Sequence, residues 1–380
     1  MIWRKILPTL FVISVLISLY SYRLLDVPTG LSLDEASFGY NAVLISQTGR
    51  DQNNRFLPMF VLTSDGKDWR QPVTQYYYAS LFRLFGPSVY LLRFASVIVA
   101  IVSVFIVYHL ATKLLTKNAA LIATLIFALN PLIYIQSHLG LDNIVPIPLT
   151  LLWLLGLYQA NQKKSLRWLI ISALSLGFSF YSYKGMRAIV PVWTITSVIW
   201  LYLTTKNNLK FPTIFLFSLA PFFLIIPVIE RFYAGAVLGG SRPVYNHIYE
   251  FFLPYLSSFD PSYLFIQGDL VANHSTGRHG TLLLASLPLI ILGIYAAFQA
   301  KNKFWRFITV SLFIAPLLFG LVGSVHRYSR LMALLPLYSL LAGLGWQHLL
   351  SYKHFSVKII GIAILFLVLL NFTDFFKFYH

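Results

Sequence analysis

The stretch SVYLLRFASVIVAIVSVFIVYHLAT, residues 88–112, decides the fold class of this chain. Its 25 residues contain one charged side chain, that of Arg93, and are otherwise dominated by aliphatic and aromatic residues. An α-helix rises 1.5 Å per residue, so about 20 apolar residues cross the ~30 Å hydrocarbon core of a bilayer. The stretch therefore predicts a helix that spans a membrane.

Ten further apolar runs of similar length recur along the 380 residues. Hydrophobic residues make up 58% of the chain and charged residues only 11%, against about 25% charged in a typical soluble domain. Because so few polar residues are available to cover a water-exposed surface, we predict an all-α polytopic membrane protein of about eleven transmembrane helices. The predicted spans are residues 6–24, 88–112, 119–136, 144–160, 168–183, 188–204, 212–229, 281–299, 305–322, 329–349 and 357–374.

These spans are expected to form a single transmembrane domain over residues 1–380. No internal repeat and no linker rich in Gly, Ser or Pro divides the chain. The first span follows Arg4 and Lys5 and lacks a small-x-small cleavage site, so we interpret it as an uncleaved signal anchor. Only residues 375–380 follow the last span, and no appended soluble domain is expected.

Two outer segments, residues 25–87 and 230–280, are long enough to hold folded structure of their own. In the first, residues 35–47 and 73–85 are predicted to form helices in the membrane interface, and further interfacial helices are expected in the second, which is the fourth outer loop. Aromatic side chains suit that depth because one edge of the ring is wet and one face is apolar. The rings that favour this position are those of Tyr76, Tyr77, Tyr78, Phe82 and Phe85.

The charged residues sort by side of the membrane. The chain has 29 Lys and Arg against 12 Asp and Glu, a net charge of +17. If the N-terminus is cytoplasmic, fourteen basic residues and no acid fall on the cytoplasmic side, and all twelve acids fall on the other. Because short loops rich in Lys and Arg stay cytoplasmic, this predicts a multi-pass protein of the plasma (inner) membrane. The fourteen are Arg4, Lys5, Lys113, Lys117, Lys163, Lys164, Arg167, Lys206, Lys210, Lys301, Lys303, Arg306, Lys353 and Lys358.

Composition and spacing also exclude several classes of site. The cytoplasmic cations come as pairs and triples at span ends, without a folded platform, which argues against a nucleic-acid partner. The chain has no Cys, so disulfides, a thiol nucleophile and Cys-ligated metals are excluded. Acids and histidines share the outer face at no spacing typical of a metal site. A divalent metal therefore stays open, and no cofactor is predicted.

Three acids stand out on the outer side. Asp34 and Glu35 lie in LSLDEASFGYNA, residues 31–42, just after the first span. Consecutive helical residues point about 100° apart, so one of the two is expected to face a cavity and the other to cap or orient the helix. Asp142 lies in the tight turn after the third span, where it is either the N-cap of the fourth span or a catalytic acid.

Basic residues also occur on the outer side, where orientation alone gives them no reason to be. They recur in three separate loops, and each of them can contact a lipid headgroup or pair with an outer acid. Their recurrence favours a specific anionic ligand at the outer leaflet, such as a lipid phosphate. These residues are Lys67, Arg70, Lys184, Arg187, His326, Arg327 and Arg330.

Five features of the sequence together resemble the C-type glycosyltransferases, the GT-C superfamily. They are most similar to its bacterial and archaeal branch, which is related to protein O-mannosyltransferases and aminoarabinose transferases. The resemblance covers nearly the whole chain. It rests on the Asp-Glu pair after the first span, LFRLFGPSVYLLRFASVIVAI (81–101), the NP…S…D turn that closes the third span, and the segments YLSSFDPSYLFIQGDLVANHSTGRHGTL (255–282) and HRYSRLMALLPLYSLLAGLG (326–345).

The resemblance implies a GT-C fold and an inverting transfer of a hexose or pentose from a polyprenyl-phosphate donor to an acceptor hydroxyl. The acceptor is a protein, a lipid or a glycan, and the reaction takes place on the extracytoplasmic face. Asp34 would be the general base, with Glu35 beside it and Asp142 as a further catalytic acid. The donor phosphate would bind Arg70, Lys184, Arg187, Arg327 and Arg330. Adjacent to the site would lie Lys67, Tyr183, Asp269, His274 and His326.

The main alternative is a polytopic transporter or flippase of a lipid-linked or anionic substrate. Such carriers place ionisable groups near the membrane midplane. None of the twelve acids lies in the middle of a predicted span, and Arg93, one turn inside the second span, is expected to snorkel outward. A non-catalytic partner protein also stays open, since acids on the outer side can serve as caps and ion-pair partners.

Overall fold

The computed structural model describes residues 3–205, 208–239, 243–269, 271, 274–323, 325–352 and 354–380. Of the predicted cytoplasmic cations, Lys206 and Lys353 lie outside this part of the chain. The described residues form an almost entirely helical bundle, and seven of its helical segments are long and apolar enough to span a membrane. They are α4 (Val89–Leu114), η1 (Asp142–Ile144) with α7 (Pro146–Lys163), α9 (Met186–Thr204), α10 (Lys210–Leu224) with α11 (Ile226–Phe232), α15 (Phe304–Ile314) with η3 (Ala315–Leu321), α16 (Tyr328–Leu331) with η4 (Met332–Leu334) and α17 (Leu335–Ser351), and α18 (Phe355–Tyr379).

An eighth span is a helix pair, α5 (Lys117–Ala128) and α6 (Pro131–Ser137), bent by 53°. The sequence predicts one straight span over residues 119–136, and the bend is a correction to it. Pro131 has no N–H to continue the α5 hydrogen-bond ladder, and the Asn130 side chain starts a new helix by accepting from the N–H groups of Leu132 and Ile133.

Three shorter apolar helices complete the bundle within the described residues. They are the C-terminal part of α1 (Trp3–Tyr20), α8 (Leu166–Phe180), and α14 (Leu287–Gln299) with η2 (Leu284–Ser286). Each of the eleven predicted apolar runs thus coincides with one helical segment. The polytopic helical fold is confirmed, although only seven or eight of the segments reach full spanning length.

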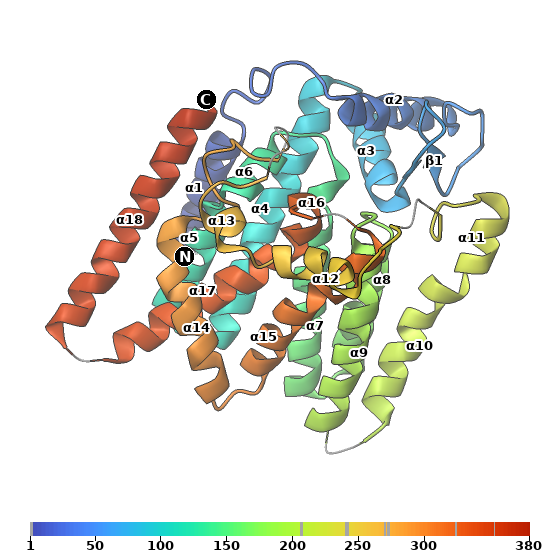
Figure 1. Ribbon diagram of the computed structural model, residues 1–380. Helices are drawn as coiled ribbons and strands as arrows, with labels where there is room; N and C mark the ends of the chain where they lie inside the picture. The colour runs from blue at the N-terminus through green and yellow to red at the C-terminus, as the bar shows by residue number, and fades with distance from the viewer. Residues whose placement is uncertain are drawn as a thin grey trace.

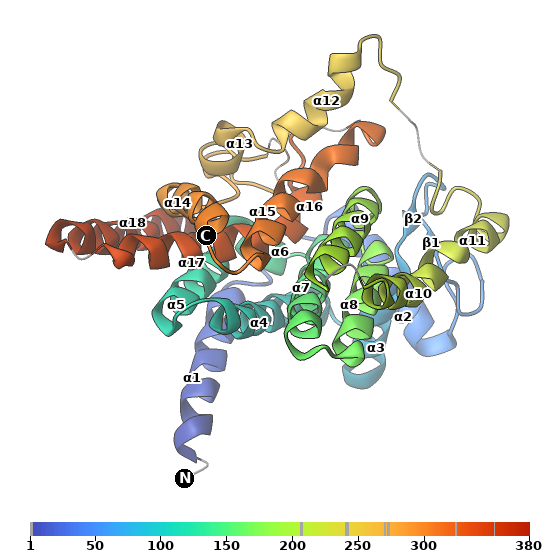
Figure 2. The ribbon, with the colours of Figure 1, turned by 90° about the horizontal axis from the view of Figure 1, so that it is seen from below.

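The elements of the first outer segment, residues 25–87, gather at one end of the bundle, which we call the α2 end (Figure 1). There α2 (Leu33–Thr48), α3 (Pro72–Phe85) and a short antiparallel hairpin of β1 (Val61–Leu62) and β2 (Trp69–Arg70) lie together, as Figure 1 shows at its upper right. The predicted helices 35–47 and 73–85 match α2 and α3 to within two residues. Figure 2 places α12 (Ile248–Ser257) and α13 (Pro261–Phe265), the helices of the 230–280 segment, away from this hairpin.

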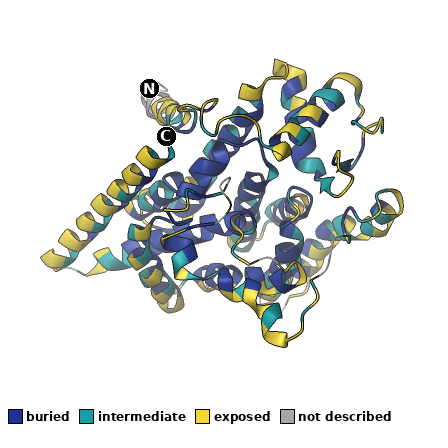
Figure 3. Cartoon of the chain, turned by 45° about the horizontal axis from the view of Figure 1, so that its top comes forward, coloured by how far each residue is buried: buried dark blue, intermediate teal, exposed yellow. Residues whose placement is uncertain are grey.

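Tight packing in the centre of the bundle holds the spans in register, and buried residues concentrate there while α18 is largely exposed (Figure 3). Trp153 of α7 stacks on Trp193 of α9 with ring centroids 4.6 Å apart. Between α14 and α17 the backbones approach so closely that a Cβ on Gly345 would lie 1.9 Å from the Leu289 carbonyl oxygen. Small residues allow such contact between helices in membranes, where packing rather than water drives association.

The tyrosines of α3 make tertiary contacts with the bundle, a role that the sequence did not indicate. Tyr78 is buried and donates to the Leu141 carbonyl at 2.9 Å, while Tyr77 donates to the Ala95 carbonyl at 2.9 Å. A buried phenol needs a hydrogen-bond partner, and both rings find theirs on the backbone of other segments. The α3 helix is therefore fixed to the bundle from its inner face, and of the aromatic set Phe85 is the one that is largely exposed.

Candidate active site

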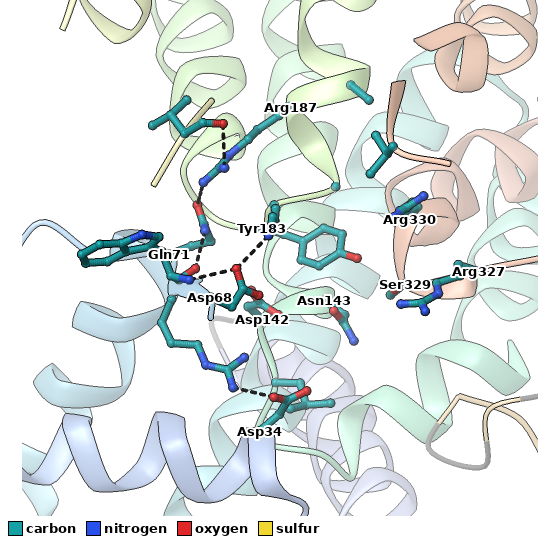
Figure 4. A pocket seen from close by; sticks show the side chains of 18 of the residues that line it. Asp34, Asp68, Gln71, Asp142, Asn143, Tyr183, Arg187, Arg327, Ser329 and Arg330 are labelled. Carbon is teal, nitrogen blue, oxygen red and sulfur yellow. Dashed lines mark hydrogen bonds and ion pairs between the residues drawn. The ribbon is translucent and has the colours of Figure 1, made fainter. Parts of the chain in front are cut away.

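A cavity of about 540 Å³ opens at the α2 end, between the first outer segment and the ends of several spans. Its wall brings together three acids and five cations that are far apart in the sequence (Figure 4). Charges of both signs around one enclosed space suit a ligand that carries both an anionic and a proton-donating group. The charged residues are Asp34, Asp68, Asp142, Arg70, Lys184, Arg187, Arg327 and Arg330.

The start of α2 separates the roles of the two neighbouring acids. Ser32 is the N-cap, and its side chain accepts from the Glu35 N–H at 3.2 Å while the Glu35 carboxylate accepts from the Ser32 N–H at 3.0 Å. This reciprocal arrangement is a capping box, and the S-x-x-E spacing of residues 32–35 encodes it. Asp34 points about 100° away from Glu35, and its side chain lines the cavity.

Asp34 forms an ion pair with Arg70 of β2, from Nη2 to Oδ1 at 2.5 Å. The Arg70 side chain is only 13% exposed, lies over the ring of Phe38 and also donates to the Ser37 hydroxyl. The Asp34 side chain is 61% exposed, and its other carboxylate oxygen makes no hydrogen bond within the described part of the chain. One oxygen is therefore held in place, and the second is open to the cavity.

Glu35 lies outside the cavity in a buried ion pair. Its carboxylate accepts from Arg93 Nε at 3.0 Å and from the Gly140 N–H at 3.0 Å, and both charged side chains are at most 1% exposed. Arg93 therefore does not snorkel outward as expected, since it points into the packed first outer segment. The same burial bears on the catalytic assignment of Glu35. Because its carboxylate is enclosed by Arg93 and Gly140, it cannot contact a ligand in the cavity. Arg93 also donates to the carbonyls of Leu24, Pro28 and Gly30.

The turn that carries Asp142 is fixed by side chains from three helices. Ser96 of α4 donates to the Leu139 carbonyl, Glu35 of α2 accepts from the Gly140 N–H, and Tyr78 of α3 donates to the Leu141 carbonyl. A side chain at Gly140 would meet Leu92 at 2.5 Å, so glycine is required there. Each of residues 139 to 141 is thus held by a hydrogen bond to a side chain of another helix.

Asp142 follows directly and lines the cavity. It begins the 3₁₀ turn η1, whereas α7 starts at Pro146 with Val145 as its N-cap. The alternative that Asp142 caps the fourth span is therefore wrong.

The β1–β2 hairpin supplies a further part of the wall. Its register pairs Val61 with Arg70, and the turn places Asp68 where its carboxylate forms an ion pair with Lys184 at 2.7 Å. Gln71, the next residue after β2, accepts from Arg187 Nη2 at 2.6 Å. The sequence did not indicate Asp68 and Gln71, although Asp68 directly follows Lys67 and Gln71 directly follows Arg70.

Further parts of the wall come from α16, from the turn between α8 and α9, and from the start of α9. Within the described part of the chain, Arg330 has a buried Nη1 without a hydrogen-bond partner, and Arg187 has a buried Nε in the same condition. Donors left unpaired in a buried position cost free energy, so both are suited to a ligand anion. Burial, followed by the charge on Asp142, raises the pKa of Tyr183 to about 12, which keeps its phenol protonated as a donor. Ser329 and Asn143, which the sequence did not indicate, also line the cavity.

The predicted site-adjacent residues divide into two groups. Tyr183 and His274 line the cavity, and burial lowers the pKa of His274, whose Nδ1 lies 3.0 Å from Gln136. The other three lie elsewhere: Lys67 in the exposed hairpin turn, Asp269 bonded to the Val271 N–H, and His326 paired with Asp260 at 3.0 Å.

Across the described ranges, no three His, Asp or Glu side chains gather closely enough to hold a metal ion.

Comparisons with known proteins agree with this architecture. Residues 70–230 match the family described as dolichyl-phosphate-mannose-protein mannosyltransferase. No curated protein sequence matches the chain. The family match begins at Arg70 and includes Asp142, Lys184 and Arg187 of the cavity wall.

Similar solved structures cover almost all of the chain. ArnT from Cupriavidus metallidurans in the apo state aligns with a TM-score of 0.61 and 14% identity over 90% of this chain and 60% of that one. ArnT bound to undecaprenyl phosphate gives 0.59 and 12% over 89% and 60%. The Archaeoglobus fulgidus oligosaccharyltransferase AglB, in complex with an inhibitory peptide and a dolichol-phosphate, gives 0.57 and 13% over 96% and 55%.

At these identities the likeness is one of fold, and this chain spans 60% or less of the length of each of these structures. The fold and the family match over residues 70–230 thus agree with the resemblance to GT-C glycosyltransferases that the sequence motifs indicate.

Proposed function

We propose that this protein transfers a sugar, a hexose or a pentose, from a polyprenyl-phosphate carrier to an acceptor hydroxyl, with inversion at the anomeric carbon. The observation that carries the proposal is one cavity in which three carboxylates face five cations. ArnT is described with undecaprenyl phosphate and AglB with a dolichol-phosphate, both of which are polyprenyl-type phosphates. The acceptor is a protein, a lipid or a glycan, and the reaction takes place on the extracytoplasmic side.

Asp34 acts as the general base in this reaction. The acceptor hydroxyl passes its proton to the carboxylate oxygen that Arg70 leaves open, and the hydroxyl oxygen bonds to the anomeric carbon. The bond from that carbon to the phosphate oxygen breaks on the opposite face of the sugar, and the polyprenyl phosphate leaves with the electron pair. Removing the proton in the transition state is worth about 10²–10⁴-fold in rate.

The cations bind the phosphate and stabilise the charge that grows on it. Arg330 and Arg187 each have a buried N–H to which no described residue offers an acceptor, and Arg327 and Tyr183 lie beside Arg330 in the cavity wall. Fixed donors aimed at developing negative charge contribute about 3 kcal/mol each in enclosed sites. Lys184, which Asp68 holds at 2.7 Å, adds positive charge at the same wall.

The test uses purified protein in detergent and a panel of undecaprenyl-phosphate-linked hexoses and pentoses, with release of undecaprenyl phosphate as the measurement. The wild-type protein is expected to release the carrier from at least one donor. Asp34→Asn should lower turnover about 10²-fold or more, because the amide cannot accept the proton, while it still binds undecaprenyl phosphate.

Asp65→Asn is the matched control, since Asp65 is an acid of the same outer segment that lies in the hairpin turn outside the cavity. Its turnover should equal that of the wild type. Wild-type turnover by Asp34→Asn would overturn the assignment of the base. A wild-type protein that neither binds undecaprenyl phosphate nor uses any donor of the panel would overturn the proposed reaction.

A further inference from the structure

The loop after α11, residues 235–239, is wrapped around one carboxylate. Glu230 of α11 accepts from the Gly235 N–H through Oε2 at 2.8 Å, and from the N–H groups of Val237 and Leu238 through Oε1 at 2.7 Å each. Hydrogen bonds from backbone N–H groups to an ionised carboxylate are about twice as strong as neutral ones. Both carboxylate oxygens of Glu230 thus accept hydrogen bonds that hold this loop in its conformation.

Two glycines allow the loop to close on itself. Gly235 has a φ of +77°, and a Cβ on Gly239 would lie 2.3 Å from the Gly235 Cα. Gly239 therefore has no room for a side chain, because the neighbouring atoms belong to the backbone. Val237, Leu238 and Gly239 form part of the cavity wall.

The loop also holds one of the cavity's cations. Arg187 Nη1 donates to the Val237 carbonyl at 3.0 Å, and Arg187 Nη2 donates to the Gln71 side chain at 2.6 Å, as Figure 4 shows. The remaining donor of the guanidinium, Nε, is buried and has no partner in the described structure. The two anchors fix the plane of the guanidinium, so the position of Val237 determines where Nε points.

The residues just before the loop are fastened to the β1–β2 hairpin. Trp69 Nε1 donates to the Ala234 carbonyl at 3.2 Å, and the Trp69 ring meets the Tyr233 ring edge-on with centroids 5.7 Å apart. The guanidinium of Arg55 lies over both rings. The loop and the hairpin therefore hold Arg187 from two sides as one connected unit.

We infer that Glu230 is a positioning residue: by fixing residues 235–239 it holds the Val237 carbonyl in place and so aims Arg187 at the phosphate group of the lipid-linked donor. Glu230 itself does not line the cavity. This inference rests on the proposed function, and it adds a residue that acts on donor binding without touching the donor.

The test variant is Glu230→Gln, which keeps the size of the side chain. Its single carbonyl oxygen can still accept, but its NH₂ group faces a backbone N–H and repels it. The loop should become more mobile, and the Arg187 guanidinium should no longer be held in one orientation. The donor KM is therefore expected to rise about fivefold to tenfold, with kcat within about twofold of the wild type. Hydrogen exchange at the amides of Gly235, Val237 and Leu238 should become faster in the same protein.

Glu250→Gln is the matched control. Glu250 of α12 accepts from the Asn246 N–H at 3.0 Å, so it is also a carboxylate bonded to backbone in the 230–280 segment, but it does not line the cavity. Its donor KM should not change. Gly239→Ala is the second variant, because it disturbs the same loop with Glu230 intact, and it should raise the donor KM in the same way.

A double variant separates positioning from general loosening. Arg187→Met alone removes the cation, and adding Glu230→Gln to it should raise the donor KM no further, because the effect of Glu230 passes through Arg187. An additive rise in the double variant would overturn the inference, as would an unchanged donor KM in Glu230→Gln with faster amide exchange. These results all require a wild-type protein that turns over donor, whereas failure of the proposed function appears in the wild type itself.

Discussion

Adjacent acidic residues at the start of α2 have different surroundings because of a single 100° step along the helix. Asp34 faces the cavity with one oxygen held by Arg70, and Glu35 is fully enclosed between Arg93 and the Gly140 N–H. The S-x-x-E pattern alone identifies Glu35 as the capping residue. The sequence did not reveal that Glu35 also pairs with Arg93, because the partner lies 58 positions later.

Glu35→Gln is expected to destabilise the protein strongly. The amide leaves the Arg93 charge buried without a counter-charge, and removing one member of a buried pair costs about 3–5 kcal/mol. The apparent Tm in detergent should therefore fall by several degrees or more. Asp34→Asn should leave it almost unchanged, since Asp34 is more than half exposed. Equal Tm values for the two variants would contradict the division of roles between the neighbouring acids.

Among the elements, length and periodicity decided what was predictable. The predicted helices 35–47 and 73–85 match α2 and α3 to within two residues, whereas strands of two residues such as β1 and β2 carry no periodic signal. The cations of the cavity were found because basic residues on the outer side depart from the rule that Lys and Arg stay cytoplasmic. Asp68 was missed because an acid beside cations suggests a local pair, and Gln71, Asn143 and Ser329 carry no charge that marks them.

One phenol, that of Tyr78, links the α3 helix to the turn that carries Asp142. Tyr78→Phe removes the phenol that donates to the Leu141 carbonyl, and the loss of one such hydrogen bond costs about 0.5–1.5 kcal/mol. We expect a lower apparent Tm and, because Asp142 follows Leu141, a lower kcat for donor turnover. Tyr40→Phe is the control, as Tyr40 lies exposed on α2. A Tyr78→Phe protein with unchanged Tm and kcat would show that the turn does not depend on this bond.

Over the whole molecule, the charge surplus of +17 divides into two unequal parts. Fourteen basic residues without any acid belong to the predicted cytoplasmic side, and 15 basic residues with 12 acids belong to the side of the cavity. The connection between α14 and α15, which carries Lys301 and Lys303, lies at the end of the bundle opposite α2 in Figure 1. The near-neutral face is thus the one that holds the cavity, where pairs such as Asp34 with Arg70 and Asp68 with Lys184 form.

This asymmetry predicts how the bundle sits in the membrane. Reporter enzymes fused after Lys164, in the turn between α7 and α8, and after Gly66, in the hairpin turn, should report opposite sides, cytoplasmic for the first and extracytoplasmic for the second. Neutralising Lys163, Lys164 and Arg167 together should weaken the cytoplasmic signal at the first position, because these cations retain that turn. Same-side signals from the two fusions would contradict the orientation, and a cytoplasmic signal after Gly66 would place the cavity on the cytoplasmic side.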